Sequence, residues 1–359
     1  MKKKHLIWVG AGGTGGHISP AAAVADKLKS KGCEIVFFTL PRNRDYPDLK
    51  SRSDQYKNLV FYNAPMFVAS PLKMFKFFKD LLLCWHTLNL EAKKGRPDAV
   101  IGFGGYPSFP LVLWAKFKSV NLYLHEQNSL FGRVTRLMAR YAKKVFLSFP
   151  ARPRIGNEVF TGNALRDQFD VSSVSKEASK KKTFSTVKNI LIIGGSQGAR
   201  DLNNLYIAMI NNHAFSKIKI CISTGPDEFE TIKNQSRKQD SVLDFITDMP
   251  QKMSTADLII SRAGSGLIFE ILWARVPAVL IPYPFAMDDH QKENAWQLSR
   301  EELAELIDIR PFDADRTVST IVDLINSGKL ENISRSLADH NFPLKGSEII
   351  ANEIINDLS

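Results

Sequence analysis

The sequence predicts an α/β protein with two domains, each built on a parallel β-sheet flanked by helices. The chain has 359 residues, enough for about two domains at roughly 150 residues each. Short apolar runs alternate with helical patterns, as in parallel strands joined by crossover helices. Twice, a strand-like run leads into a glycine-rich turn, first at residues 5–16 and again at residues 189–199. Two Rossmann-like domains facing a cleft follow from these observations.

Composition restricts the class of protein further. Hydrophobic residues make up 44% of the chain and charged residues 24%, as in ordinary globular proteins. This excludes a disordered chain, a collagen and a disulfide-stapled miniprotein. The three cysteines, Cys33, Cys84 and Cys221, form no CxxC pair, which indicates a reduced, cytosolic protein without a zinc clamp.

Charge is distributed unevenly along the chain. Residues 1–166 hold 27 Lys and Arg against 10 Asp and Glu, a net charge of +17, whereas residues 167–359 hold 21 against 27, a net charge of −6. A basic half favours an anionic partner, which can be nucleic acid, an acidic membrane surface or phosphates. Charge alone does not choose among these, and a solvated basic face is the simplest alternative.

The first predicted strand covers residues 5–9 and leads into the loop Gly10–Gly16. The basic N-terminus resembles a signal peptide, but glycines and His17 interrupt its apolar core, so a buried strand is the better interpretation. The uncharged stretch 99–115 falls short of the ~20 residues that a membrane span needs. No transmembrane helix is predicted.

Further strands are expected at residues 34–38, 99–101, 122–124, 189–193, 219–222, 258–260 and 278–281.

A helix is predicted to begin at Ser70-Pro71, with serine as the N-cap and proline in the first helical position. Apolar side chains follow at helical spacing, and three lysines line one stripe: Leu72, Phe75, Phe78, Leu82 and Trp85, with Lys73, Lys76 and Lys79. Such a basic helix can lie in a membrane interface, with Trp114 as a neighbouring apolar residue. The alternative is a buried helix with a lysine edge, and the sequence leaves both open.

The predicted domains are residues 1–162 and 188–341. Between them, residues 163–187 form a linker region, because the segment Val171–Lys188 is rich in serine and lysine and has no apolar period. The last segment, 342–359, has the apolar spacing of a C-terminal helix.

Both glycine loops can bind phosphate, because glycines let the backbone N–H groups at a helix N-terminus approach an anion. Gly10, Gly12 and Gly15 match the dinucleotide fingerprint, which also requires an acid at the end of the second strand. Here Glu34 stands at the start of that strand, and the strand ends without an acid. A nicotinamide cofactor is therefore disfavoured, and no cofactor is expected. Two phosphate loops suit a reaction in which both substrates carry diphosphates.

Seven blocks in order identify a resemblance that spans most of the chain. They are Gly12–Pro20, Gly102–Tyr106, His125–Asn128, Gly162–Arg166, Gly194–Ala199, Ser261–Gly264 with Glu270, and Asp289–Gln291 with Asn294-Ala295. Together they resemble the MurG family, the peptidoglycan N-acetylglucosaminyltransferases that convert lipid I to lipid II. Leu267, Thr135 and Phe109 depart from the family pattern, which puts individual donor contacts in doubt but not the class.

The resemblance implies a GT-B fold and inverting transfer of GlcNAc from UDP-GlcNAc to the C4 hydroxyl of MurNAc in lipid I. The first domain would face the membrane and bind the acceptor, and the second would bind the donor. The implied partners are UDP-GlcNAc, lipid I, an anionic membrane surface on the cytoplasmic face of the inner membrane and other proteins of cell-wall synthesis, with no nucleic acid. Roles in cell shape and cell division follow from the same resemblance.

Three catalytic candidates follow. His17 opens a helix, whose dipole disfavours imidazolium, so a neutral histidine that accepts a proton is expected; alternatively it only donates to phosphate. Glu126 is an alternative base, or a carboxylate that orients its neighbours. Arg166 would neutralise the departing UDP, or form a salt bridge between domains.

The binding candidates are implied by the same family pattern. Ser196 and its loop would hold the donor diphosphate, Glu270 the ribose and Ile246 the uracil. The other donor contacts are expected from Thr14, Gly15, Gly16, Asn128, Ser265, Gln291 and Asn294. The acceptor diphosphate is expected at Gly13, Gly104, Gly105 and Tyr106.

No essential metal is expected. Asp313-Ala314-Asp315 is a DxD string, a pattern that binds metal in other glycosyltransferases, but it stands at a predicted helix start, where N-capping is favoured. Asp288-Asp289-His290 can also mimic a metal site, although its glutamine and asparagine neighbours indicate sugar binding.

Three other functions compete with this prediction. A related transferase could act on another lipid-linked acceptor. A UDP-sugar epimerase shares the fold and needs no lipid surface. A nucleic-acid binder is suggested by charge alone, and no zinc, RNP or recognition-helix motif supports it.

Overall fold

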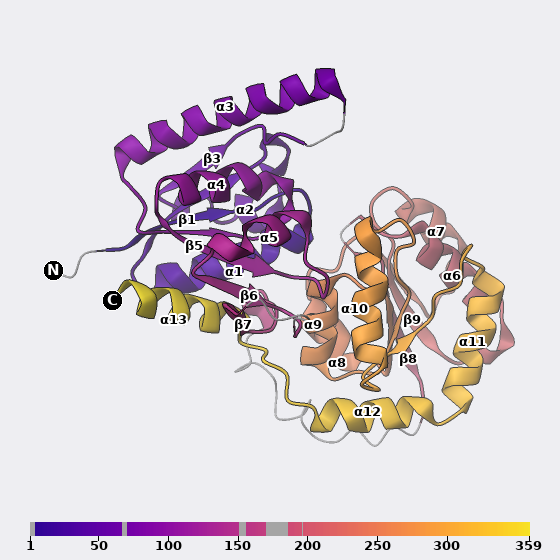
Figure 1. Ribbon diagram of the computed structural model, residues 1–359. Coiled ribbons are helices and arrows are strands. Elements are labelled where there is room, and N and C mark those ends of the chain that lie inside the picture. Colours follow the sequence, from indigo (N-terminus) through magenta and orange to yellow (C-terminus); the bar gives the residue numbers. More distant parts are fainter. Residues whose placement is uncertain (1–3, 67–69, 151–155, 170–185, 196) are drawn as a thin grey trace. The chain divides into compact units, whose positions relative to one another are not determined.

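The computed structural model describes residues 4–66, 70–150, 156–169, 186–195 and 197–359 (Figure 1). It divides into two compact units. Unit 1 comprises residues 1–167 together with 343–359, and unit 2 comprises residues 168–342. The C-terminal helix, which the sequence pattern did not assign to a domain, therefore belongs to unit 1.

Unit 1 contains a seven-stranded parallel sheet in the order β3-β2-β1-β4-β5-β6-β7. The strands are β1 (Leu6–Gly10), β2 (Glu34–Thr39), β3 (Asn58–Phe61), β4 (Ala99–Gly102), β5 (Asn121–Glu126), β6 (Lys144–Leu147) and β7 (Glu158–Phe160). The helices are α1 (Gly15–Ser30), α2 (Pro47–Lys50), α3 (Pro71–Lys94), α4 (Gly105–Phe117), α5 (Arg133–Met138) and α13 (Gly346–Leu358). α3 begins at Pro71, as predicted.

Both faces of this sheet are covered, because successive side chains of a strand point to opposite faces. On one face Ile7 and Val9 pack with α1 and α13, and on the other Trp8 packs with α3 and α4. Figure 1 shows α3 and α13 on opposite sides of unit 1. Strands buried on both faces read as continuous apolar runs, which is why the sequence pattern identified β1 and β4.

α13 is fixed to unit 1 by apolar and ionic contacts. Ile350 and Ile354 are fully buried in the core beside α1. The Lys144 ammonium group donates to Glu353 at 2.7 Å and to Asp357 at 2.9 Å, and the Tyr123 hydroxyl donates to Asp357 at 3.1 Å. The final helix thus completes one face of the first sheet.

Unit 2 contains a six-stranded parallel sheet in the order β10-β9-β8-β11-β12-β13, the doubly wound order of dinucleotide-binding folds. The strands are β8 (Asn189–Ile193), β9 (Lys219–Ser223), β10 (Ser241–Leu243), β11 (Leu258–Ser261), β12 (Ala278–Leu280) and β13 (Glu305–Leu306). The helices are α6 (Arg200–Ile210), α7 (Phe229–Gln235), α8 (Met249–Thr255), α9 (Ser265–Ala274), α10 (His290–Ser299), α11 (Ala314–Asn326) and α12 (Lys329–Asp339).

Each sheet has a topological switch point, where the chain leaves neighbouring strands in opposite directions. It lies between β1 and β4 in unit 1 and between β8 and β11 in unit 2. Ligands of open α/β sheets bind outside the carboxyl ends of the strands at such points. All the glycine loops singled out in the sequence lie there.

Among the described residues of the expected membrane surface, Trp114 lies in the core instead. The side chains of Leu72 and Lys73 lie outside the part of the chain that the structure describes. Trp114 was expected as an apolar neighbour of the exposed helix, but only 2% of it is exposed. Its ring stacks on Trp8 at 4.9 Å, and its indole nitrogen donates to Asn89 of α3 at 3.0 Å. The residues of α4 from Leu111 to Ala115 are all apolar, so the sequence does not indicate which of them face the sheet and could not separate Trp114 from a surface residue.

Candidate active site

In unit 1 two glycine loops meet at the switch point. Gly10 at the end of β1 lies opposite Gly102 at the end of β4. Gly104 and Gly105, which open α4, have φ values of +72° and +67° that other residues rarely adopt. At Gly15 a Cβ would collide with the Tyr46 hydroxyl. The loops therefore need glycine, and the N-termini of α1 and α4 provide the N–H groups for an anion.

His17 lies in the first turn of α1, against the second glycine loop. A Cβ built on Gly104 or Gly105 would lie only 3.4–3.6 Å from its ring. The ring nitrogen Nδ1 is 3.1 Å from Oε1 of Gln127, which follows β5. Three different elements thus fix the imidazole at the carboxyl edge of the sheet.

Glu126 is engaged by the backbone that follows it. Only 2% of the residue is exposed. One carboxylate oxygen accepts the N–H of Asn128 at 3.2 Å, and the other accepts the N–H of Gly132 at 2.9 Å. Both oxygens are therefore occupied in shaping the loop that presents Asn128. Of its two predicted roles, the geometry favours the orienting carboxylate.

The remaining candidates of unit 1 lie around the same loops. Thr14 and Gly16 are exposed at the start of α1, whereas Gly13, Gly15, Tyr106 and Asn128 are half-buried. Arg166, also half-buried, follows β7 in unit 1. A cavity of about 580 Å³ extends from Tyr106 to α3, and Arg42 and Lys76 are among its lining residues. A polar acceptor thus has room beside the expected diphosphate loops.

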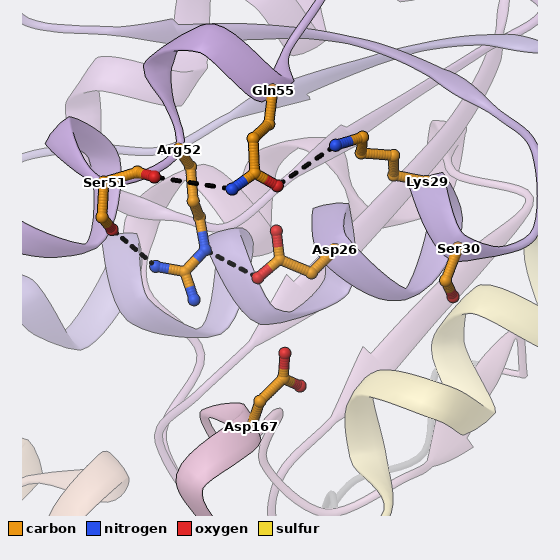
Figure 2. A pocket seen from close by; sticks show the side chains of 7 residues that line it. All are labelled: Asp26, Lys29, Ser30, Ser51, Arg52, Gln55 and Asp167. Carbon is orange, nitrogen blue, oxygen red and sulfur yellow. Dashed lines mark hydrogen bonds and ion pairs between the residues drawn. The ribbon is translucent and has the colours of Figure 1, made fainter.

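A second cavity of unit 1, of about 510 Å³, lies at the other end of α1 (Figure 2). Its charged groups are paired within the protein. Nε of Arg52 donates to Asp26 at 2.6 Å, and Lys29 donates to the side chain of Gln55 at 3.1 Å. Because α1 separates this cavity from His17, it is not part of the candidate site.

In unit 2 the loop after β8 carries the glycines expected to hold the donor diphosphate. Gly195 and Gly198 have φ values of +93° and +74°. A Cβ on Gly198 would collide with the carbonyl of Thr224, which follows β9. The loops after β8 and β9 therefore approach each other backbone to backbone. Ser196 lies outside the described residues. The loop leads into α6, whose N-terminal N–H groups face the same edge of the sheet.

Arg262, from the turn after β11, is a structural residue. It is buried, and its guanidinium donates to Asp201 at 2.6 Å and to the Pro282 carbonyl at 3.0 Å. The ion pair joins the starts of α6 and α9. The charge of Arg262 is thus already neutralised within unit 2.

The other donor candidates come from α9, α10 and the loops before them. Ser265 and Glu270 lie on α9 and are largely buried. Asn294 is fully buried and donates to the Ala263 carbonyl at 3.2 Å, and Gln291 accepts the N–H of Tyr283 at 2.9 Å. These amides hold the loops in place. The Ile246 side chain is 3% exposed, whereas the adjacent Phe245 is 45% exposed, so a uracil would meet the backbone of Ile246.

The acidic motifs have local roles. Asp313 caps α11, accepting the N–H of Arg316 at 2.9 Å, as the capping interpretation predicts. Asp289 pairs with Arg310 at 2.8 Å. Within the part of the chain that the structure describes, no three His, Cys, Asp or Glu side chains are grouped so that they could hold a metal ion.

One residue escaped the sequence analysis as a site residue. Gln127 lies inside the His125–Asn128 block, but nothing in a single sequence indicates that its side chain reaches His17, 110 residues away. The contact forms because the fold brings the start of α1 and the end of β5 together at the carboxyl edge of the sheet.

Comparisons with known proteins agree with this architecture. Residues 7–147 match the N-terminal domain of glycosyltransferase family 28, and residues 189–346 match its C-terminal domain. A UDP-N-acetylglucosamine--N-acetylmuramyl-(pentapeptide) pyrophosphoryl-undecaprenol N-acetylglucosamine transferase of a Wolbachia strain from Drosophila simulans is 33% identical, over 92% of this chain and 93% of that protein. The Leptospira interrogans protein of the same name is 32% identical, over 91% and 92%.

Solved structures give the same result. The crystal structure of Acinetobacter baumannii MurG matches with a TM-score of 0.77 and 26% identity, covering 99% of this chain and all of that one. The UDP-GlcNAc 2-epimerase of Neisseria meningitidis, at 14% identity and a TM-score of 0.63, shares the fold alone. With both domains matched in order and relatives at 32–33% identity over nine-tenths of its length, this GT-B chain belongs to glycosyltransferase family 28, in its MurG family.

Proposed function

We propose that the chain transfers GlcNAc, with inversion, from UDP-GlcNAc to the C4 hydroxyl of MurNAc in undecaprenyl-pyrophosphoryl-MurNAc-pentapeptide, giving lipid II and UDP for peptidoglycan synthesis. The observation that carries the proposal is the presence of glycine loops at both switch points, in a chain whose relatives over nine-tenths of its length bear the name of this transferase. Unit 1 would bind the acceptor and unit 2 the donor.

In the proposed reaction His17 takes the proton of the C4 hydroxyl. The oxygen's electron pair then forms the bond to the anomeric carbon of GlcNAc, on the face opposite the diphosphate. The bond from that carbon to UDP breaks, and its electrons leave with UDP. Negative charge develops on the diphosphate, so the N–H groups of the 194–199 loop and the cation of Arg166 would stabilise the transition state most.

The test is to incubate the full chain with UDP-GlcNAc, with and without lipid I, and to identify the product. We expect UDP release that depends on lipid I and a β-linked disaccharide. Transfer only to a different polyprenyl-linked acceptor would favour the related transferase. Conversion of UDP-GlcNAc to an epimer without acceptor, or a product of retained configuration, would contradict the proposal.

We further propose that α3 attaches the protein peripherally to the cytoplasmic face of the inner membrane. Phe75 is 74% exposed, Leu82 69% and Phe78 56%, and Lys76 and Lys79 are exposed beside them. Exposed aromatics flanked by lysines suit an interface with anionic lipids. No helix in the described parts of the chain has the length and apolarity to cross a bilayer, and the acceptor's polyprenyl tail requires the enzyme to approach the membrane.

A further inference from the structure

Gln127 is buried between three polar partners. The residue is 1% exposed. Its amide nitrogen Nε2 donates to the Phe103 carbonyl at 2.9 Å and lies 3.0 Å from Nδ1 of His125. Its amide oxygen Oε1 lies 3.1 Å from Nδ1 of His17. The side chain therefore connects a buried histidine to the histidine proposed as the base.

The Phe103 carbonyl fixes the orientation of this amide. A carbonyl oxygen can only accept a hydrogen bond, so the NH₂ end of Gln127 must face it. The amide oxygen then faces His17, and it too can only accept. The proton of the hydrogen bond must therefore be on Nδ1 of His17. In the neutral ring, Nε2 consequently carries no proton.

His125 supports the same arrangement from the other side. Its ring is fully buried, and burial lowers the pKa of this histidine to about 3, so the ring is neutral. Its Nδ1 accepts the second proton of the Gln127 amide, which places the ring's own proton on Nε2, 3.4 Å from the Ser148 hydroxyl. One tautomer of each histidine satisfies all these hydrogen bonds.

We propose that Gln127 is a positioning residue that holds His17 in its Nδ1–H tautomer, so that Nε2 is the atom that takes the proton from the acceptor hydroxyl. This inference rests on the proposed function, in which His17 is the base. When Nε2 gains the proton, the bond from Nδ1–H to Gln127 remains intact. No rearrangement of the buried amide is needed during the reaction, which is the condition for a preorganised base.

The tautomer can be measured without any substrate. In the full chain labelled with ¹⁵N-histidine, the ring signals of His17 are assigned by their loss in His17→Asn. We expect a protonated Nδ1 and an unprotonated Nε2 in the wild type at neutral to alkaline pH. A proton on Nε2 of the neutral ring would overturn the proposal, even if every Gln127 variant failed to fold.

Variants then separate positioning from simple packing. Gln127→Met, similar in volume but without an acceptor, should give a mixture of tautomers and lower kcat about 10- to 100-fold, within the range of general-base effects. KM for UDP-GlcNAc should change less than about twofold. Gln127→Glu keeps an oxygen acceptor, and in its protonated form also a donor for Phe103, so it should restore the Nδ1–H tautomer and much of kcat.

Gln55→Met, on the exposed rim of the other cavity of unit 1, is the matched control and should leave both readouts unchanged. If Gln127→Met kept the wild-type tautomer and kcat, Gln127 would have no positioning role. If the wild type showed the expected tautomer but transferred no GlcNAc to lipid I, the proposed function would fail while the assignment of the proton stood.

Discussion

At the scale of single residues, burial lowers the pKa of His125, a histidine other than the proposed base, to about 3, against ~6.5 in an unfolded chain. Between these values the unfolded chain binds a proton that the folded chain does not. The free energy of unfolding therefore falls as the pH is lowered from about 6.5 toward 3, and above about pH 6.5 the contribution of His125 is constant.

The stability of the protein should therefore depend on pH in the acidic range mainly through His125. Urea denaturation between pH 7.5 and 5 should show the free energy of unfolding falling below pH 6.5, by about 1 kcal/mol per pH unit from His125. His125→Gln should remove most of that slope. His213→Gln, at an exposed histidine, should retain it. If the free energy of unfolding fell equally steeply with pH in the wild type and both variants, His125 would not be the cause of the loss of stability in acid.

Glu126 and His17 should differ in the kind of loss they cause. His17→Ala should lower kcat at least about 100-fold, as expected when a general base is removed. Glu126→Gln replaces one acceptor of a backbone N–H by a donor, so it should distort the loop 128–132 and cost less, about 10-fold. Steady-state kinetics with a water-soluble acceptor would test this. A larger loss for Glu126→Gln than for His17→Ala would make Glu126 the better candidate for the base.

The donor residues should divide between binding and turnover. Glu270→Ala should act mainly by weakening UDP binding, measured by calorimetry, because its proposed contact with the ribose is made before and during the reaction. Arg166→Ala should lower kcat more than it raises KM, because in the proposed mechanism its charge acts mainly as UDP leaves. Wild-type kinetics in Arg166→Ala would remove that residue from the mechanism.

At the scale of elements, two glycines of the loop after β8, which is proposed to hold the donor, offer a matched comparison. Gly195 and Gly198 both have positive φ, but a Cβ on Gly195 would meet nothing within 4 Å, whereas one on Gly198 would collide with backbone. Gly195→Ala should therefore cost about 1 kcal/mol of stability from the backbone conformation alone. Gly198→Ala should cost several kcal/mol and weaken UDP binding, because two loops must separate. Thermal unfolding with and without UDP distinguishes the two; equal costs would contradict the close approach.

The exposed face of α3 makes a second prediction at this scale. Charge alone gives binding that salt reverses, whereas inserted aromatics leave a salt-resistant fraction. In co-sedimentation with anionic vesicles across a salt series, Phe75→Ser with Phe78→Ser should remove that fraction. Turnover of a water-soluble acceptor should persist. A double variant that binds vesicles like the wild type would place the membrane site elsewhere.

At the scale of the whole molecule, the sequence predicts the features that depend on residues close together in the chain. Ser70-Pro71 mark the start of α3, and the apolar runs mark the central strands, because propensity and hydrophobicity act over a few residues. Contacts across the sheet leave no such signal. The bond between His17 and Gln127, the burial of Trp114 and the short edge strands β7 and β13 depend on which segments meet in the fold. The glycine loops were predictable, and the hydrogen bonds that connect Gln127 to the proposed base were not.

The C-terminal helix α13 packs on unit 1, although it follows unit 2 in the sequence. Mutations in α13 should therefore destabilise unit 1 more than unit 2. Ile350 of α13 is fully buried beside α1, whereas the adjacent Ile349 is half-buried. Ile350→Ala should leave a cavity and cost about 2–4 kcal/mol, against about 1 kcal/mol or less for Ile349→Ala. Hydrogen exchange should then rise in α1 and β5 of unit 1, while the amides of β8 and β11 in unit 2 keep their protection. Equal loosening of both units would mean that the final helix stabilises the chain as a whole, and a loss confined to unit 2 would contradict its assignment to unit 1.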